Sequence, residues 1–108
     1  MGKNNDSPLM NSLKTLSNLS IPEFIHSDDF RTIRFQGMDY YLTLTQSRVV
    51  ERLYSYYQQH IPEIHQDTLL ENLEIHSKRL RDVFKNSPAW GTFILRGQKK
   101  GTFKLNLA

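Results

Sequence analysis

Two short stretches in the first half of the chain alternate between apolar and polar residues. They are residues 32–35 and residues 38–42, and Gln36-Gly37 separates them. Alternation with a period of two around a glycine turn is typical of paired strands. The pattern therefore predicts a short N-terminal β-hairpin that packs on the core.

After this hairpin the apolar residues recur at helical spacing. Thr43 and Gln46 have the spacing of a capping box, in which each side chain accepts a hydrogen bond from the other residue's backbone N–H. The helix that they open should run to about His60, because Pro62 prevents its continuation. Its buried stripe would consist of Gln46, Val50, Leu53 and Tyr57, flanked by Val49 and Tyr54.

Two shorter helical patterns follow, over residues 66–73 and 78–86. Ser77 is a good N-cap for the second one, so only residues 73–76 are left for the break between them. Two short helices with so tight a connection predict a helix-turn-helix. Their apolar faces would be Leu69, Leu70 and Leu73 in the first, and Leu80, Val83 and Phe84 in the second.

The last segment contains two similar stretches, residues 91–95 and 101–105. Each begins with Gly-Thr-Phe, and the pattern predicts a second hairpin with one apolar face and one solvent-exposed polar face. Its loop, residues 96–100, holds three basic residues and is flanked by glycines, so it should project. The apolar face would consist of Phe93, Leu95, Phe103, Leu105 and Leu107.

Residues 1–29 are rich in Asn and Ser, and we interpret them as a mobile N-terminal arm. Ser7-Pro8 resembles a helix start, and the apolar residues behind it have helical spacing. This short amphipathic segment has three open fates: docking on the domain, pairing with a second copy, or staying frayed. Its apolar residues are Leu9, Met10, Leu13, Leu16 and Leu19.

The size and composition limit the class of protein. A chain of 108 residues with 38% apolar content can form one small domain with one core. It has no apolar run of about 18 residues, so we expect no membrane span, and its first residues lack the order of a secretory signal. The absence of cysteine excludes disulfides and Cys-based zinc sites. A cytoplasmic location is expected.

The charge is strongly polarised along the chain. Residues 1–76 contain six basic and ten acidic residues, a net charge of −4. Residues 77–108 contain eight basic residues and one acidic residue, a net charge of +7, so the whole chain carries +3. A field of this kind can steer a polyanion onto one face of the molecule. The C-terminal third is therefore the expected binding region.

The order of these elements resembles the winged helix-turn-helix family, and most closely the OmpR/PhoB-type DNA-binding domain of bacterial regulators. The resemblance covers about residues 31–107 and depends on the order of elements, since no single motif is diagnostic. It implies an α+β fold with a short N-terminal hairpin, three helices and a C-terminal hairpin as the wing, over residues 30–108. The matching segments are the strand pair, Leu42-Thr43-Leu44-Thr45-Gln46, Leu69-Leu70-Glu71-Asn72-Leu73, Ser77-Lys78-Arg79-Leu80-Arg81, and Arg96-Gly97 through Leu105.

The resemblance also implies a way of binding duplex DNA. The helix over residues 78–86 would enter the major groove, where Arg can bridge the guanine acceptors and Asp can accept from cytosine. The loop 96–100 would contact phosphates or the minor groove, and the start of the second helix would touch the backbone. The predicted DNA-binding residues are Lys78, Arg79, Arg81, Asp82 and Lys85, then Arg96, Lys99 and Lys100, and more weakly Gln66 and Thr68.

Two departures from the family narrow the expected role. The family has a longer connection between its second and third helices, used to contact RNA polymerase, and it is often controlled by a phosphoacceptor receiver domain. Neither is expected in this chain. A stand-alone transcriptional or mobile-element regulator fits better, and a homodimer through the N-terminal segment or the first helix is open because one such domain reads only a half-site.

Other interpretations of the same residues stay open. A charged helix face can simply be solvated, and hairpin tips often carry Lys for solubility. The cationic face could meet an acidic protein, or the aromatic residues could stack on single strands or RNA, although core packing is favoured for Trp90, Tyr54 and Tyr57. The spacing of the four histidines is not typical of metal ligands; they are His26, His60, His65 and His76. The sequence also contains no recognisable catalytic motif. We therefore expect no metal, no cofactor and no enzymatic activity.

Overall fold

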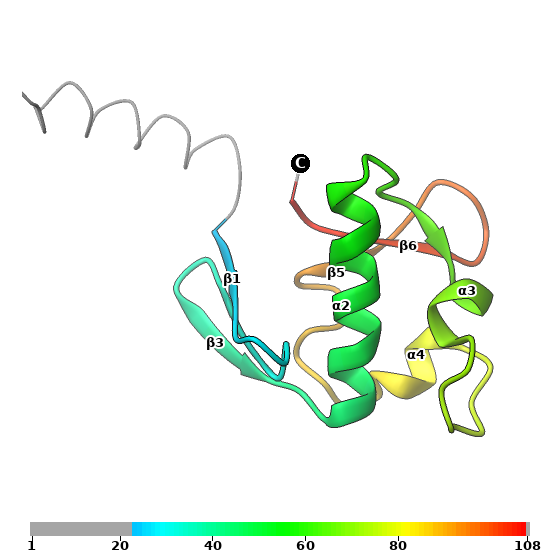
Figure 1. Ribbon diagram of the computed structural model, residues 1–108, viewed down its shortest axis with the longest axis horizontal. Coiled ribbons are helices and arrows are strands. Elements are labelled where there is room, and N and C mark those ends of the chain that lie inside the picture. Colours follow the sequence, from blue (N-terminus) through cyan, green and yellow to red (C-terminus); the bar gives the residue numbers. More distant parts are fainter. Residues whose placement is uncertain (1–22, 108) are drawn as a thin grey trace, which may run out of the picture.

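The protein is described by a computed structural model that covers residues 23–107 (Figure 1). Within this range it is an α+β structure with three helices and two three-stranded antiparallel sheets. The amphipathic segment predicted near Ser7-Pro8 lies outside the described residues. No helix in the described part of the chain has the length and apolar character needed to cross a membrane.

The first sheet contains the predicted N-terminal hairpin and one further strand. Strands β2 (Thr32–Phe35) and β3 (Met38–Tyr41) pair around the Gln36-Gly37 turn, as predicted. A third strand, β1 (Phe24–His26), pairs with β2 on the other side. The prediction that residues 1–29 form a mobile arm is therefore wrong for its last part, because ordered structure begins at β1. Three residues are too short to be recognised as a strand from their own pattern.

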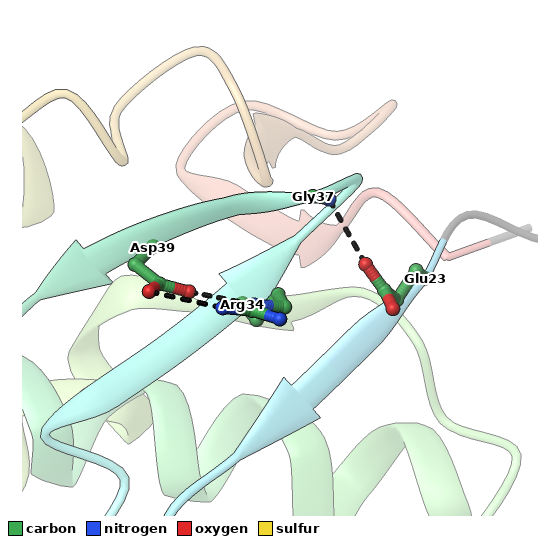
Figure 2. Close-up of polar contacts among 4 residues, drawn as sticks. All are labelled: Glu23, Arg34, Gly37 and Asp39. Carbon is green, nitrogen blue, oxygen red and sulfur yellow. Dashed lines mark hydrogen bonds and ion pairs between the residues drawn. The ribbon is translucent and has the colours of Figure 1, made fainter.

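Exposed polar contacts connect the strands of this sheet and the hairpin turn (Figure 2). Arg34 forms a two-pronged ion pair with Asp39 across β2 and β3, with Nε to Oδ1 at 2.7 Å. Hydrogen bonding to the opposite charge raises the pKa of Arg34 and lowers that of Asp39. The carboxylate of Glu23, just before β1, accepts the backbone N–H of Gly37 at 2.9 Å, which fixes the start of β1 to the hairpin turn.

The segment between β1 and β2 is a hydrogen-bonded turn. The Asp29 carboxylate accepts the backbone N–H of Arg31 at 3.0 Å and the hydroxyl of Ser27 at 2.8 Å. The bond from the Arg31 amide, and after it the Ser27 hydroxyl, lowers the pKa of Asp29. The turn ends at Phe30, a buried residue with a φ of 62°. Residues 27–29, which the sequence analysis assigned to the mobile arm, therefore form a structured connection.

Helix α2 (Leu44–Gln58) is the longest described helix and agrees with the prediction. The capping box is present, because Thr43 Oγ1 accepts the N–H of Gln46 and Gln46 Oε1 accepts the N–H of Thr43. In Figure 1, α2 stands between the first sheet and the two short helices. Its side toward the core buries Gln46, Ser47, Val49, Val50 and Leu53.

The two short helices differ from their predicted bounds. Helix α3 (Gln66–Leu70) ends before Leu73, and α4 (Leu80–Val83) is a single turn that replaces the predicted helix 78–86. Ser77 does not cap α4, because the chain is still extended at Arg79, where φ is −121° and ψ is 134°. The connection between α3 and α4 therefore runs over residues 71–79, and the predicted tight break at 73–76 is wrong.

Long-range contacts explain why α4 is so short. The side-chain Oε1 of Gln66 accepts the backbone N–H of Leu80 at 2.8 Å, so the cap comes from α3 and not from a neighbouring residue. At the other end Asn86 has a φ of 65°, a left-handed conformation that Asn tolerates and that ends a helix. Helix α4 ends at Val83, with Phe84 as its C-cap, and the left-handed Asn86 two residues later prevents the helix from resuming.

The second sheet contains the predicted C-terminal hairpin, β5 (Ile94–Arg96) and β6 (Thr102–Leu105), and a further strand, β4 (Ile64–His65), in the order β4-β6-β5. In the register Ile94 faces Leu105 and Arg96 faces Phe103. The predicted placement of Leu95 on the apolar face is therefore wrong by one residue. In the observed register the side chain of Ile94, and not that of Leu95, points into the core, and Arg96 lies on the same face as Phe103.

One core joins both sheets and the helices. Its fully buried side chains include Ile33 from the first sheet, Leu53 from α2, Leu80 from α4 and Ile94 from the second sheet. Tyr54, Tyr57 and Trp90 are half-buried and pack against this core, as predicted, and Tyr56 packs against it as well. A single core fixes α4 and the C-terminal hairpin in one frame.

Candidate nucleic-acid interface

The predicted basic residues are exposed and available for a ligand. Within residues 23–107 none of them forms an ion pair with an acidic side chain, whereas Arg34 does. The seven exposed bases of the predicted site are Lys78, Arg79, Arg81, Lys85, Arg96, Lys99 and Lys100. Their positive charge is therefore not neutralised by contacts within the described part of the molecule.

Five of these bases gather around two adjacent hollows in the surface. The first, which we call the hairpin hollow, lies between the α4 region and the C-terminal hairpin, has a volume of about 380 Å³ and has no acidic residue in its lining. It is lined by Gln66, Arg79, Arg81, Trp90, Arg96, Lys100, Gly101 and Phe103.

The second hollow, which we call the turn hollow, lies at the segment after α4 and contains the one acidic residue of the group, Asp82. It shares Arg79, Arg81 and Trp90 with the hairpin hollow. The two hollows therefore form a continuous basic surface around Trp90. The turn hollow is lined by Arg79, Arg81, Asp82, Phe84, Lys85, Asn86, Ser87 and Trp90.

Two glutamines hold α4, which places its basic residues. Gln66 Oε1 accepts from the N–H of Leu80 at its start, and Gln46 Nε2 donates to the C=O of Val83 at its end at 3.0 Å. Gln46 belongs to α2 and is buried, with 8% of its surface exposed. Helix α4 is thus held at both ends by side chains from elements that come earlier in the chain.

Four hydrogen bonds to backbone atoms hold the loop of the C-terminal hairpin. The carboxylate of Glu63 accepts the N–H of Gln98 at 2.8 Å, and the C=O of Gly101 accepts the N–H of Gln66 at 2.8 Å. Inside the loop, Lys99 C=O accepts both the N–H and the hydroxyl of Thr102. Because these bonds fix the loop backbone, the side chains of residues 96–100 project from a defined position.

Gln66 and Thr68 both belong to α3, but they line different hollows. Gln66 lies in the hairpin hollow, but its side-chain oxygen is used to cap α4. Thr68 lines a separate hollow beside α2 together with Arg52 and Glu71, and it does not line either basic hollow. Lys78 and Lys99 are exposed but lie outside the linings of the two hollows.

Trp90 is the residue that sequence reasoning did not place in the site. It is half-buried, stacks on Phe84 with ring centroids 6.1 Å apart, and lies 5.3 Å from the ring of Phe103. Core packing was predicted for it, and this holds for part of the ring. The rest lines both hollows, a position that no local pattern indicates.

No known protein family, curated protein or solved structure matches this chain. In the part that the structure describes, no three His, Asp or Glu side chains come together in a group that could hold a metal ion. The arrangement of the basic residues therefore carries the functional argument.

Proposed function

We propose that this protein binds duplex DNA as a winged helix-turn-helix protein, with the α4 region and the hairpin loop 96–100 as its contact surface. The observation that carries the proposal is the hairpin hollow, where Arg79 and Arg81 from one segment meet Arg96 and Lys100 from another. Clustered basic side chains on one face are the electrostatic footprint of a nucleic-acid-binding protein. The order of helices followed by a hairpin supports the same fold family.

The short α4 limits how the base edges would be read. Arg81 and Asp82 are exposed on this single turn, so they are the residues we assign to the major groove. Lys78 and Arg79 lie in the extended segment before it and, with the loop, would contact phosphates. With so few base contacts, one copy of the protein would recognise only half of a DNA site. The proposal therefore includes a homodimer that forms through the N-terminal segment or α2. This dimer would act as a regulator in the cytoplasm.

Fluorescence anisotropy with labelled random duplex at several salt concentrations tests the proposal. We expect binding that weakens by about 0.9 log units per log unit of salt for each phosphate contacted. The variant Lys100→Glu should bind more weakly than the matched variant Arg48→Glu, which makes the same charge change at an exposed position of α2 outside both hollows. Absence of duplex binding at low salt, or tighter binding of single strands, would overturn the proposal.

A second pair of variants separates base contacts from backbone contacts. Arg81→Ala should lower the preference between duplex sequences, because it removes a contact to base edges. Lys99→Ala should weaken binding to all duplexes similarly and reduce the salt slope by about one contact. The measurement is the same titration on a selected site and on random duplex. Equal effects of both variants on both duplexes would contradict the assigned roles.

A further inference from the structure

Basic side chains line the hairpin hollow from two separate segments of the chain. Arg79 and Arg81 line it from the α4 region, while Arg96 and Lys100 line it from the hairpin. A guanidinium group matches the geometry of a phosphate and can donate two parallel hydrogen bonds to two of its oxygens. A group that enters between the two sides would meet cations from both.

The rest of the lining is aromatic. Arg96 pairs with Phe103 across β5 and β6, so both side chains lie on the face of the sheet that lines the hollow. Trp90 contacts Phe103 and is also covered by Phe84. Since Phe84 stacks on it, Trp90 serves as an apolar wall more than as a free platform for a base, and an apolar wall beside a phosphate suits the adjoining deoxyribose.

Gln66 fixes the distance between the two sides. Its backbone N–H donates to the C=O of Gly101 in the hairpin, and its side chain accepts from the N–H of Leu80 in α4. One residue therefore ties both halves of the hollow together at 2.8 Å on each side. The basic side chains are held in one frame before any ligand arrives, which lowers the entropy cost of binding.

We infer that the hairpin hollow binds one phosphodiester group of the nucleic-acid backbone, with Arg79 on one side, Arg96 and Lys100 on the other, and Trp90 against the sugar. Arg81, which also lines the turn hollow, remains assigned to the base edges. The inference deepens the proposed function and rests on it, because it names the part of the DNA that this hollow holds. Gln66 acts as a positioning residue and does not have to bind the phosphate itself.

Trp90 offers a direct local signal, because it is the one tryptophan in the chain. Its fluorescence is measured while the protein is titrated with duplex, with an oligomer of base-free deoxyribose phosphates, with a nucleoside and with a mononucleotide. We expect a saturable change with the duplex and with the base-free oligomer, none with the nucleoside, and a change with the mononucleotide only at much higher concentration.

Gln66→Glu provides the sharpest variant. It keeps the oxygen that accepts from Leu80 N–H and places a negative charge beside the proposed phosphate. We expect binding of the base-free oligomer to weaken about tenfold, while Thr68→Glu, the same charge change on α3 but in a separate hollow, has little effect. Urea unfolding shows whether each variant is folded. Lys100→Gln, at an exposed position of the loop, is an independent variant that removes one positive charge from the hollow.

The outcomes separate this inference from the proposed function. If anisotropy shows duplex binding and Trp90 fluorescence stays unchanged, the DNA-binding proposal stands and the phosphate site is wrong. Equal loss with Gln66→Glu and Thr68→Glu would also overturn it. A mononucleotide that binds as tightly as the base-free oligomer would overturn the assignment to the nucleic-acid backbone in favour of a free nucleotide. Absence of binding to any duplex would overturn both proposals.

Discussion

Gly101 is a position in the hairpin loop where a single added methyl group should disturb the proposed site. Its φ is 79°, in the left-handed region, and a Cβ atom built on it would lie 2.6 Å from Nε2 of His65. The imidazole is not free to move away without cost, because its Nδ1 accepts the N–H of Asp67 at 3.1 Å and so caps α3. Gly101→Ala should therefore disturb both the hairpin loop and the start of α3.

The size of this effect follows from two contributions. Placing alanine in the left-handed region costs about 1 kcal/mol, and loss of a helix N-cap costs about 1 kcal/mol more. We expect Gly101→Ala to lower the free energy of unfolding by about 2 kcal/mol. Gly37→Ala is the matched control, since its φ is 81° but nothing lies within 4 Å of the added Cβ, so it should lose only the first contribution.

Urea unfolding followed by circular dichroism measures both values. Adding His65→Ala to Gly101→Ala tests the cause, because removal of the imidazole should eliminate the additional cost at Gly101 in a double-mutant cycle. Equal destabilisation by Gly101→Ala and Gly37→Ala, or additive effects of Gly101→Ala and His65→Ala, would refute the argument from contact with His65.

Two further variants test contacts elsewhere in the fold. Gln46→Ala should lower the free energy of unfolding by about 2 kcal/mol, because it removes one half of the capping box and the donor to Val83 C=O; Gln58→Ala, at an exposed position of the same helix, should change it by less than about 0.5 kcal/mol in the same urea titration. The Arg34–Asp39 pair lowers the pKa of Asp39 in the folded state, so its contribution is present above the unfolded pKa of about 3.9 and is lost as the pH falls through the lower folded pKa. The difference in urea midpoint between the native protein and Asp39→Asn should therefore be constant near neutral pH and shrink below about pH 4, and a difference that stays constant down to pH 2 would contradict this assignment.

Elements defined by their own residues could be predicted from the sequence. The hairpin of β2 and β3 and the helix α2 carry local signals, namely alternation around Gly37 and the capping box of Thr43 and Gln46, and the structure confirms them. Strand β1 was missed because three residues carry no period of their own, and it forms because β2 offers a free edge. The one-residue error at Leu95 has a similar origin, since the register is set by pairing with β6.

The candidate site could be predicted only in part for the same reason. The basic residues are visible in the sequence as charge, and their exposure in the structure agrees with that reading. Their grouping around one hollow depends on Gln66, whose role as a cap for Leu80 spans 14 positions of the chain. Core packing was favoured for Trp90, because large aromatic side chains are usually buried. Its position at the shared wall of two hollows depends on where α4 ends.

The short α4 and the basic surface have a common cause. A single helical turn is unstable on its own, because nucleation fixes several residues for one hydrogen bond. Here Gln46 and Gln66 satisfy its ends from α2 and α3, and Leu80 is fully buried. Because tertiary contacts replace helical length, α4 can present Arg81 beside a hairpin that Gln66 also holds. The same two glutamines that stabilise the turn therefore set the geometry in which a phosphate would be bound, so stability and binding should respond together when either one is removed.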